Sequence, residues 1–369
     1  MVVSAVSVRN FRSYEAAVAH LDADLTILVG PNGAGKTNLL EAIYYGCTAR
    51  SCRTANDREV VRFGADAARV TVGFDSASGP HEIGVGFAPG EAKRVKLDGS
   101  EIERLLDVPD RPLVSVFLPD RLGLIKGPPA LRRAHLDQLV AALWPARAAN
   151  RRAYGAVLIQ RNALLLRIRS GRAGRESLGA WDAQLAEAAT ELMADRRRAV
   201  ECVSAGFTEM CRVLGLEGAV CLAYRPRSHA GDAQSFVGEL EERLAGDLER
   251  GYTGYGPHRD ELVIKRDSRE LRVYGSQGQQ RLALLGLLLA ERELIGELRG
   301  TPPLLLLDDV MSELDSSRRA ALIRLLRDRP GQALITTTEL DHVPGGVSSG
   351  VTRLGVTGSG LLQPVSEAA

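Results

Sequence analysis

The sequence contains little lysine, little cysteine and few aromatic residues, and its net charge is close to zero. Its 369 residues include 47 Lys and Arg against 46 Asp and Glu, which leaves a formal charge of +1. This balance excludes a chain that is basic throughout, as histones are. With 45% hydrophobic and 25% charged residues the composition is that of a folded protein, and the length predicts two or three domains.

The five cysteines form no CxxC pair, and their number is odd. Both facts argue against zinc-site spacings and a disulfide framework, and we expect reduced thiols in a cytoplasmic protein. No uninterrupted apolar run approaches the ~20 residues of a membrane span. Arg9 places a charge within the first ten positions, which argues against a signal peptide.

The secondary structure that the sequence predicts changes twice along the chain. Residues 1–120 alternate short β-rich runs with turns, residues 121–250 space their aliphatic side chains helically, and residues 251–345 return to α/β texture. A Gly/Ser/Arg-rich stretch at 170–179 predicts the turn between two antiparallel helices. Residues 346–369 predict a flexible tail. We therefore expect an α/β protein whose first lobe, split between 1–120 and 251–345, receives a mostly helical second lobe as an insertion.

A glycine-rich motif follows a predicted strand at 25–29 and precedes a predicted helix at 38–45. It matches GxxxxGK[ST] and comprises Gly30, Pro31, Asn32, Gly33, Ala34, Gly35, Lys36 and Thr37. Backbone N–H groups of such a loop point at phosphate oxygens, and the helix N-terminus adds its positive end. Lys36, one of only five lysines, would supply a compact positive charge to the β- and γ-phosphates. Thr37 would supply a hydroxyl ligand for Mg²⁺, so the motif predicts ATP binding with Mg²⁺.

Four leucines at 304–307 form a predicted apolar strand that ends in two carboxylates, Asp308 and Asp309. Open α/β sheets bind their ligands at the carboxyl ends of the strands. Asp308 is predicted to hold Mg²⁺, and Asp309 to orient or deprotonate the attacking water. Together with Lys36, these carboxylates form the predicted catalytic set. A strand followed by an ordinary polar turn is the alternative reading of this segment.

The two motifs stand about 270 residues apart, farther than one compact domain of roughly 100–150 residues would place them. This spacing predicts a split nucleotide domain, as in ABC-type ATPases of the SMC class. Ser276, Gln277, Gly278 and Gln279 open a predicted helix at 277–298 and resemble the signature motif of that class. A helix N-terminus attracts anions, and in this class the signature binds the γ-phosphate held by the opposite protomer. The alternative is an N-capping serine.

The segment after the second motif resembles the D-loop of ABC ATPases. Its Ser312 and Asp315 would lie at the same dimer interface. Many ABC ATPases carry a switch histidine after the next strand, but residues 335–339 contain none, so Thr337 or Thr338 would contact the γ-phosphate. Arg12 is a candidate for the adenine contact.

Several further stretches resemble the RecF family, the bacterial recombination mediator ATPases. The resemblance runs from Arg9 to about Thr338 and includes Cys52-Arg53-Thr54, Phe117-Leu118-Pro119-Asp120, Lys126-Gly127-Pro128-Pro129, Arg132-Arg133, Leu136-Asp137 and Thr253-Gly254-Tyr255-Gly256-Pro257-His258-Arg259-Asp260. Two positions depart from the family pattern: Cys52 replaces the usual His, and Asp120 stands where Pro-Glu-Asp is usual. The missing switch histidine is itself a trait of the family.

This resemblance implies an SMC-like, ABC-type ATPase lobe and a helical lobe without a long coiled coil. It implies a weak ATPase whose ATP-dependent homodimer binds double-stranded DNA, gapped DNA or single-strand/double-strand junctions. RecF proteins act with RecO and RecR to load RecA, and support replication, gap repair and the SOS response. Another short-armed SMC-class ATPase of DNA maintenance is the alternative. Long-armed SMC proteins and zinc-hook proteins fit less well, because the insertion spans about 130 residues without CxxC. Transporter subunits fit less well because their chains are shorter and their two nucleotide motifs lie closer together.

Basic residues are concentrated between Lys126 and Arg175, where eleven cations accompany one acid, Asp137. Clustered arginine is the electrostatic footprint of phosphate binding. The candidate DNA contacts are Arg132, Arg133, Arg147, Arg151, Arg152 and Arg161. Aromatic residues make up 5% of the chain, which favours binding to a duplex backbone over base stacking. A solvated basic face is the alternative.

Overall fold

The computed structural model describes residues 1–103, 105, 108, 111–118, 122–346, 351–357 and 362–364. The predicted motif residues Pro119 and Asp120 therefore lie outside the described residues. The chain divides into two compact units. The first comprises Met1–Arg121, Val213–Gly215 and Ile295–Ala369, and the second comprises Leu122–Arg212 and Leu216–Leu294.

A six-stranded sheet in the first unit positions both predicted nucleotide motifs. Its order is β15-β14-β3-β13-β12-β8, and all its neighbouring pairs are parallel except β14 with β15. The strands are β3 (Leu25–Val29), β8 (Val114–Phe117), β12 (Leu304–Leu307), β13 (Ala333–Thr337), β14 (Val351–Val356) and β15 (Leu362–Pro364). Because β3 and β12 flank β13 in one parallel sheet, the loops after them open at the same edge.

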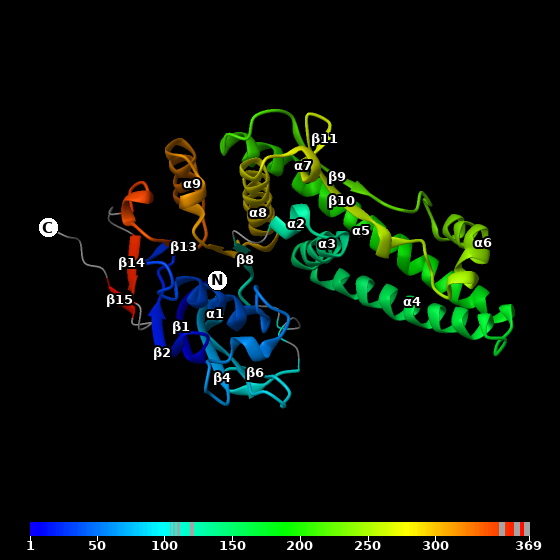
Figure 1. Ribbon diagram of the computed structural model, residues 1–369, viewed down its shortest axis with the longest axis horizontal. Helices are drawn as coiled ribbons and strands as arrows, with labels where there is room; N and C mark the ends of the chain where they lie inside the picture. Colours follow the sequence, from blue (N-terminus) through cyan, green and yellow to red (C-terminus); the bar gives the residue numbers. More distant parts are fainter. Residues whose placement is uncertain are drawn as a thin grey trace. The chain divides into compact units, whose positions relative to one another are not determined.

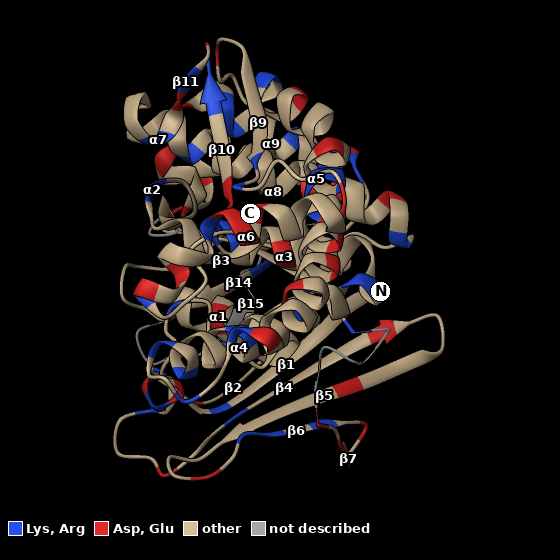
Figure 2. Cartoon of the chain, turned by 90° about the vertical axis from the view of Figure 1, so that its right-hand side faces the viewer, with Lys and Arg blue, Asp and Glu red and all other residues tan. Residues whose placement is uncertain are grey.

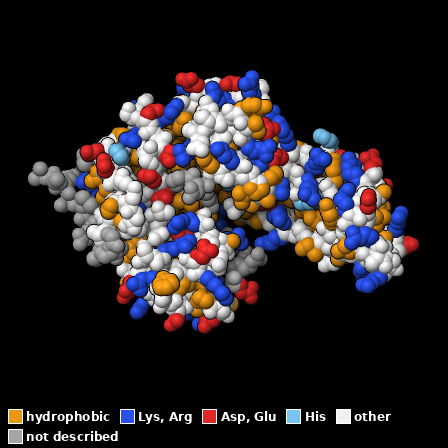
Figure 3. Space-filling model, in the orientation of Figure 1, with side chains coloured by type: hydrophobic (Ala, Val, Ile, Leu, Met, Phe, Trp, Pro, Cys, Tyr) orange, Lys and Arg blue, Asp and Glu red, His pale blue; other side chains and the backbone are white. Residues whose placement is uncertain are grey.

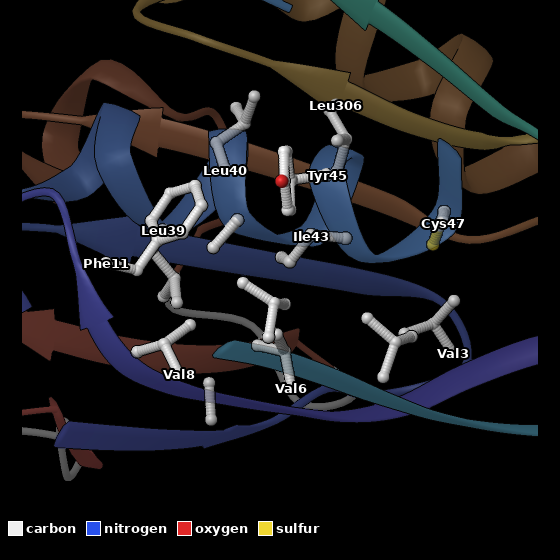
Figure 4. Close-up of a cluster of buried hydrophobic side chains, with 14 of the residues drawn as sticks. Val3, Val6, Val8, Phe11, Leu39, Leu40, Ile43, Tyr45, Cys47 and Leu306 are labelled. Carbon is white, nitrogen blue, oxygen red and sulfur yellow. The ribbon is translucent and has the colours of Figure 1, made fainter. Parts of the chain in front are cut away.

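An antiparallel sheet forms the second layer of this unit. Its order is β2-β1-β4-β5-β6-β7, from β1 (Val2–Phe11), β2 (Tyr14–His20), β4 (Ala68–Ser76), β5 (Gly79–Phe87), β6 (Arg94–Leu97) and β7 (Ser100–Glu101). Helix α1 (Lys36–Thr48) contacts strands of both sheets. Its Leu39, Leu40 and Ile43 are fully buried, because the helix is apolar on both of these faces (Figure 4). Helix α1, which begins at the end of the glycine-rich phosphate-binding loop at residues 30–37 (the P-loop), is thus held between two sheets.

The flexible tail predicted for residues 346–369 is corrected by strand β14. This strand pairs in parallel with β3, from Val351 opposite Leu25 to Gly355 opposite Val29. Leu354 and Val356 are buried in the same core cluster as Leu28. The Gly/Ser content around the strand hid a short segment with two buried aliphatic residues, Leu354 and Val356.

Helices dominate the second unit. They are α2 (Gly123–Lys126), α3 (Pro129–Leu143), α4 (Ala148–Arg169), α5 (Leu178–Val213), α6 (Ala233–Arg250), α7 (Leu271–Tyr274) and α8 (Gln277–Arg299), whose last residues belong to the first unit. The predicted turn at 170–179 is confirmed, because α4 ends at Arg169 and α5 begins at Leu178. Figure 1 shows α4 and α5 running alongside each other as a hairpin.

The predicted boundary at residue 250 also needs correction, because residues 251–294 belong to the second unit. Strand β10 (Glu261–Arg266) pairs antiparallel with β9 (Val220–Arg225) and with the short β11 (Arg269–Glu270). This small sheet packs on α3 through β10. The strands at 261–270 therefore belong to the helical lobe and not to the sheet that carries the nucleotide motifs.

Short 3-10 turns join several of these elements. They cover Asp57–Val60, Pro145–Arg147, Arg175–Ser177, Pro257–Arg259, Val310–Glu313 and Leu340–His342. One further helix, α9 (Ser316–Asp328), follows the Val310–Glu313 turn in the first unit. None of the helices that the structure describes is long and apolar enough to cross a membrane.

Candidate nucleotide site and candidate nucleic-acid interface

The glycine-rich loop connects β3 to α1, as the motif predicts. Gly33 and Gly35 have φ angles of 79° and 111°, which disfavour any residue with a Cβ atom. A Cβ atom on Gly35 would also lie 2.9 Å from the hydroxyl of Tyr14, which donates a hydrogen bond to the Gly35 carbonyl at 3.0 Å. A Cβ atom on Gly30 would collide with the carbonyl of Val356. The loop is therefore shaped by β14 and by Tyr14 as well as by its own glycines.

The ammonium group of Lys36 is folded over this loop. Its Nζ donates hydrogen bonds to the carbonyls of Gly30 at 2.6 Å and Pro31 at 3.0 Å, and the residue is only 7% exposed. Burial lowers the pKa of Lys36, while the nearby carboxylates of Asp309 and Asp308 oppose that shift. The charge is thus placed inside the loop, where phosphate oxygens would be its natural partners.

Thr37 and Asp308 meet although they are 271 residues apart. The Thr37 hydroxyl lies 2.9 Å from both carboxylate oxygens of Asp308, which is 6% exposed at the end of β12. Thr336 donates a second hydrogen bond to Asp308 at 2.7 Å and accepts one from the backbone N–H of Asp309 at 2.9 Å. Sequence reasoning missed Thr336, because three consecutive threonines at 336–338 look alike and only the fold turns the first toward β12.

Hydroxyl and carboxylate oxygens are the ligands that Mg²⁺ prefers, and it usually keeps only one or two protein ligands beside phosphates and water. Thr37 and Asp308 supply such a pair. No group of three or more His, Cys, Asp or Glu among the described residues could form an all-protein metal cage. The donors present therefore fit a Mg²⁺ that is bound together with a nucleotide.

Asp309 follows Asp308 in a strained conformation. Its φ of 44° is in the left-handed region, which costs free energy in a non-glycine residue. Its carboxylate accepts a hydrogen bond at 2.8 Å from Ser312, one of the predicted D-loop residues. The other, Asp315, caps α9 by accepting a hydrogen bond from the Arg318 N–H at 2.9 Å. The segment is arranged to fix the direction of the Asp309 side chain.

The two candidate switch threonines differ in their surroundings. Thr337 is fully buried, and its hydroxyl donates to the carbonyl of Glu339 at 2.9 Å. Thr338 is partly exposed beyond the end of β13. Thr338 is therefore the better placed of the two threonines to contact a ligand outside the sheet.

A buried glutamate on α1 organises a cluster that the sequence did not reveal. Glu41 is fully buried, and its two carboxylate oxygens accept hydrogen bonds from the Arg12 guanidinium at 2.9 and 2.8 Å. Arg53 and Ser51 also donate to Glu41, which ties the Cys52-Arg53-Thr54 stretch to the P-loop helix. Arg12, our adenine candidate, is thus held by Glu41 and by the carbonyl of Glu59.

The signature segment lies in the second unit, at the exposed start of α8. The Ser276 hydroxyl accepts a hydrogen bond from the Gln279 N–H at 3.3 Å, and the Gln279 side chain accepts one from the Ser276 N–H at 2.9 Å. This reciprocal pair is a capping box. Gln277 and Gly278 are exposed. The serine therefore caps its helix and still presents a helix N-terminus to solvent.

Replacing Asp308 with asparagine is expected to stabilise the nucleotide-free protein while removing its ATPase activity. Burial raises the pKa of Asp308 and neighbouring Asp309 raises it further, against the lowering effect of Thr336 and Thr37. A carboxyl group whose pKa is higher in the folded protein than in the unfolded chain lowers the free energy of unfolding once the pH exceeds its pKa in the unfolded chain. At pH 7 the melting temperature should rise by roughly 1–4 °C, as scanning calorimetry would measure. An unchanged or lower melting temperature would contradict this account.

The structure corrects two of the predicted DNA contacts. Arg161 is fully buried and pairs with Asp182 at 2.6 Å and Asp247 at 3.0 Å. Arg132, 3% exposed, makes a bidentate pair with Glu261 at 2.6 and 2.9 Å. Their acidic partners come from outside the segment 126–175, so part of its local charge excess is neutralised within the fold. Figure 2 shows acidic positions among the basic ones on α3, α5 and α6.

The remaining candidates are more accessible but mostly paired. Arg147 pairs with Asp195 at 2.7 Å, and Arg151 with Asp137 at 3.0 Å. Arg133 donates to the carbonyl of Asp260, and Arg152 is exposed on α4. An exposed ion pair can exchange its partner for a phosphate, whereas a buried one cannot reach it.

Arg161 and Arg152 form a matched pair for testing this distinction. Arg161→Ala removes the cation that pairs with buried Asp182 and one of the two that pair with buried Asp247, and we expect a loss of about 3–5 kcal/mol in unfolding free energy. Arg152→Ala, at an exposed position of the same helix, should change it by less than about 0.5 kcal/mol. Urea titration of both variants measures the difference; equal stabilities would show that the buried network contributes little.

Comparisons with known proteins agree with this fold. The model of the RecF/RecN/SMC N terminal domain matches residues 2–352. A RecF structure with ATP, described as a recombination mediator of the RecFOR pathway, superposes with a TM-score of 0.86 at 27% identity over 99% of this chain and 98% of that chain. A SmcHead structure, 17% identical with a TM-score of 0.61, shares the fold over 100% of this chain and 98% of that one. The chain thus has the α/β head of SMC-like, ABC-type ATPases.

Sequence relatives narrow the class. A DNA replication and repair protein RecF from Anaeromyxobacter sp. (strain Fw109-5) is 39% identical over 92% of this chain and 93% of its own length. The RecF of Halalkalibacterium halodurans is 34% identical over 93% of this chain and 94% of its own length. The chain therefore belongs to the RecF family of DNA replication and repair proteins.

Proposed function

We propose that this chain is an ATP-dependent DNA-binding protein of recombinational repair, in which ATP closes a homodimer on DNA and hydrolysis reopens it. The observation that carries the proposal is the meeting of Thr37 and Asp308, which joins two motifs 271 residues apart into one site. The ATP-bound RecF structure with which the chain superposes over 99% of its length supports the same reading.

In this proposal the loop 30–37 binds the phosphates through its N–H groups, and Lys36 neutralises the charge that develops on the γ-phosphate. Thr37 and Asp308 would hold Mg²⁺, which supplies charge neutralisation between the β- and γ-phosphates. Asp309, oriented by Ser312 and by its left-handed backbone, would position the attacking water and accept its proton. Thr336 holds Asp308 and the backbone of Asp309 in this arrangement.

The signature and D-loop segments would act across the dimer. In this scheme Ser276 and the N-terminus of α8 bind the γ-phosphate of ATP held by a second copy, alongside Gln277, Gly278 and Gln279. Ser312 and Asp315 would lie at that interface. Because each ATP then contacts both copies, nucleotide binding and dimerisation are linked: whatever strengthens one strengthens the other. Such an enzyme needs only slow hydrolysis, since turnover serves to reopen the dimer.

The cellular role follows from the family. RecF relatives are described as DNA replication and repair proteins, and the solved RecF structures as components of the RecFOR pathway. We propose that this protein acts in the cytoplasm on duplex, gapped or junction DNA, with RecO and RecR as partners and RecA as the protein finally loaded. Support for replication, gap repair and the SOS response would follow from that loading.

Sedimentation of the full chain with Mg²⁺, with and without ATP and a gapped duplex, tests the proposal. We expect a monomer without nucleotide, a dimer with ATP, and a heavier complex when DNA is added. A sedimentation coefficient that does not respond to ATP would contradict the proposed function.

A further inference from the structure

One motif of the RecF resemblance has no role in the nucleotide site. It is the stretch from Thr253 to Asp260, in the second unit between α6 and β10. Most of its side chains point inward: Thr253, Tyr255, Pro257 and Asp260 are buried. Arg259 is exposed, and Tyr252 immediately before the motif is 43% exposed. The segment therefore presents a cation and an aromatic ring to solvent from an otherwise inward-facing stretch.

The buried side chains of this stretch are fixed by hydrogen bonds to helices α4 and α5. His258 lies between the Tyr154 hydroxyl at 2.6 Å and the Thr253 carbonyl at 2.9 Å. Burial lowers the pKa of His258 to about 4, so the ring is neutral at pH 7. Its Nε2 must then donate to the carbonyl, and its Nδ1 accepts from Tyr154. The position just before Arg259 is thus tied to α4.

The other flank of Arg259 is fixed as firmly. Asp260 accepts hydrogen bonds from Tyr224, from the N–H of Arg227 at 2.7 Å and from Arg196 at 3.2 Å. Arg196 of α5 also donates to the Pro257 carbonyl at 2.7 Å. Satisfied buried networks of this kind hold a backbone in a single conformation. The side chain of Arg259 is consequently attached to a rigid backbone. When it binds a ligand, only the rotamers of the side chain itself need to be ordered.

Further arginines surround the exposed pair. The guanidinium groups of Arg250 and Arg259 lie 5.8 and 6.0 Å from the centre of the Tyr252 ring. Arg169 donates to the carbonyls of Glu249 and Arg250 beside them. The pKa of the Arg133 guanidinium is lowered, first by burial and then by the like charge of Arg196. The charge of Arg259 lowers it further, so Arg133 and Arg259 lie near each other. We name the exposed group Arg169, Arg250, Tyr252 and Arg259 the Tyr252 face.

The acids that balance these arginines lie inside the protein. Asp247, the partner of Arg250, has a fully buried side chain, while that of Arg250 is 45% exposed. Asp260 is 1% exposed. Among the residues that the structure describes, none accepts a hydrogen bond or an ion pair from the Arg259 guanidinium. Figure 3 shows basic side chains, with acidic ones among them, at the surface over the part of the chain that holds α4 and α6. Asp247 and Asp260 are thus inside while the three arginines of the face are outside, so the Tyr252 face carries more cations than acids, with exposed Glu249 as an acid beside it.

From this arrangement we infer that the Tyr252 face binds the phosphodiester backbone of duplex DNA, with Arg259 as its central phosphate contact. A guanidinium fits a phosphate by two parallel hydrogen bonds, and because the backbone at Arg259 is already fixed, only the rotamers of its side chain remain to be ordered. Tyr252 would pack against the adjacent deoxyribose and keep Arg250 and Arg259 apart. The inference rests on the proposed DNA binding and places it on a surface that the charge pattern of residues 126–175 did not indicate.

Salt-dependent binding of a fluorescent 30-base-pair duplex to the full chain, with ATP and Mg²⁺, tests this surface. Arg259→Gln should weaken binding about two- to fivefold at moderate salt, and should reduce the slope of log affinity against log salt by about 1 for each protomer on the duplex. Arg259→Lys should retain most of the slope, because it keeps the charge. Tyr252→Ser should weaken binding with little change in slope.

Arg212→Gln is the matched control, because Arg212 is 73% exposed on α5 and pairs only locally with Glu209. It should bind DNA like the wild type. If the wild type shows a steep salt slope that Arg259→Gln leaves intact, the Tyr252 face is not the DNA surface, while the proposed function stands. If the wild type binds no duplex, the proposed function fails, and this inference fails with it. An equal loss in Arg212→Gln would point to a diffuse charge effect and also overturn the inference.

Discussion

Replacing Lys36 with alanine is expected to remove ATP binding. The Nζ atom is held over the loop by the carbonyls of Gly30 and Pro31, so a bound phosphate would gain a charge already in position. Charge-assisted hydrogen bonds to two phosphates contribute about 3 kcal/mol or more, which corresponds to at least ~100-fold in affinity. Equilibrium binding of a fluorescent ATP analogue measures the loss.

The same variant should remain folded. Burial lowers the pKa of Lys36, so its charged form is less stable in the folded protein than in water, and its removal relieves that cost. Lys96→Ala, at an exposed position of the antiparallel sheet, is the control and should bind ATP normally. Wild-type affinity in Lys36→Ala, with an intact fold, would show that the loop is not the phosphate site.

Replacing Ser276 with arginine should separate ATP binding from dimerisation. The P-loop lies in the other compact unit, so ATP affinity of the monomer should stay within about twofold. The long cation would occupy the helix N-terminus where the γ-phosphate of a second copy is proposed to bind, and it opposes the helix dipole. We expect the ATP-dependent dimer to weaken by at least ~100-fold in sedimentation. A wild-type dimer would contradict the proposed trans contact.

Ser276→Asp distinguishes this effect from a simple loss of the helix cap. Aspartate caps helices as well as serine does and could still accept the Gln279 N–H. Its negative charge, however, would repel ATP phosphates. We therefore expect a normal melting temperature together with a lost dimer. If Ser276→Asp dimerises normally, Ser276 acts only as a cap.

Much of the nucleotide site could be predicted from the sequence because its parts are local. A glycine-rich loop between a strand and a helix, or an apolar strand ending in two aspartates, carries its geometry within ten residues. The contact between Thr37 and Asp308 followed from the rule that parallel strands open their loops at one edge. The role of Thr336 did not follow, because it depends on which threonine of three faces β12.

The sequence predicted which arginines are exposed less well than it predicted the nucleotide motifs. Arg161 and Arg132 look like surface cations within a basic segment, but their partners Asp182, Asp247 and Glu261 are 21 to 129 residues away. Local charge counts cannot register pairing over such separations. The boundary at residue 250 failed for a related reason, because the β texture after it does not reveal that β10 pairs with β9.

The place of β14 beside β3 has a consequence for how the protein is made. A ribosome releases the chain from its N-terminus at about 5–20 residues per second, so β3 and the P-loop emerge long before their neighbours in the sheet. The antiparallel sheet and the helical hairpin can form early from contacts close in sequence, whereas β3 must wait for β13 and β14. Protease should therefore cut readily near the P-loop in nascent chains whose residues 333–357 have not yet left the ribosome, whereas the released full chain should resist.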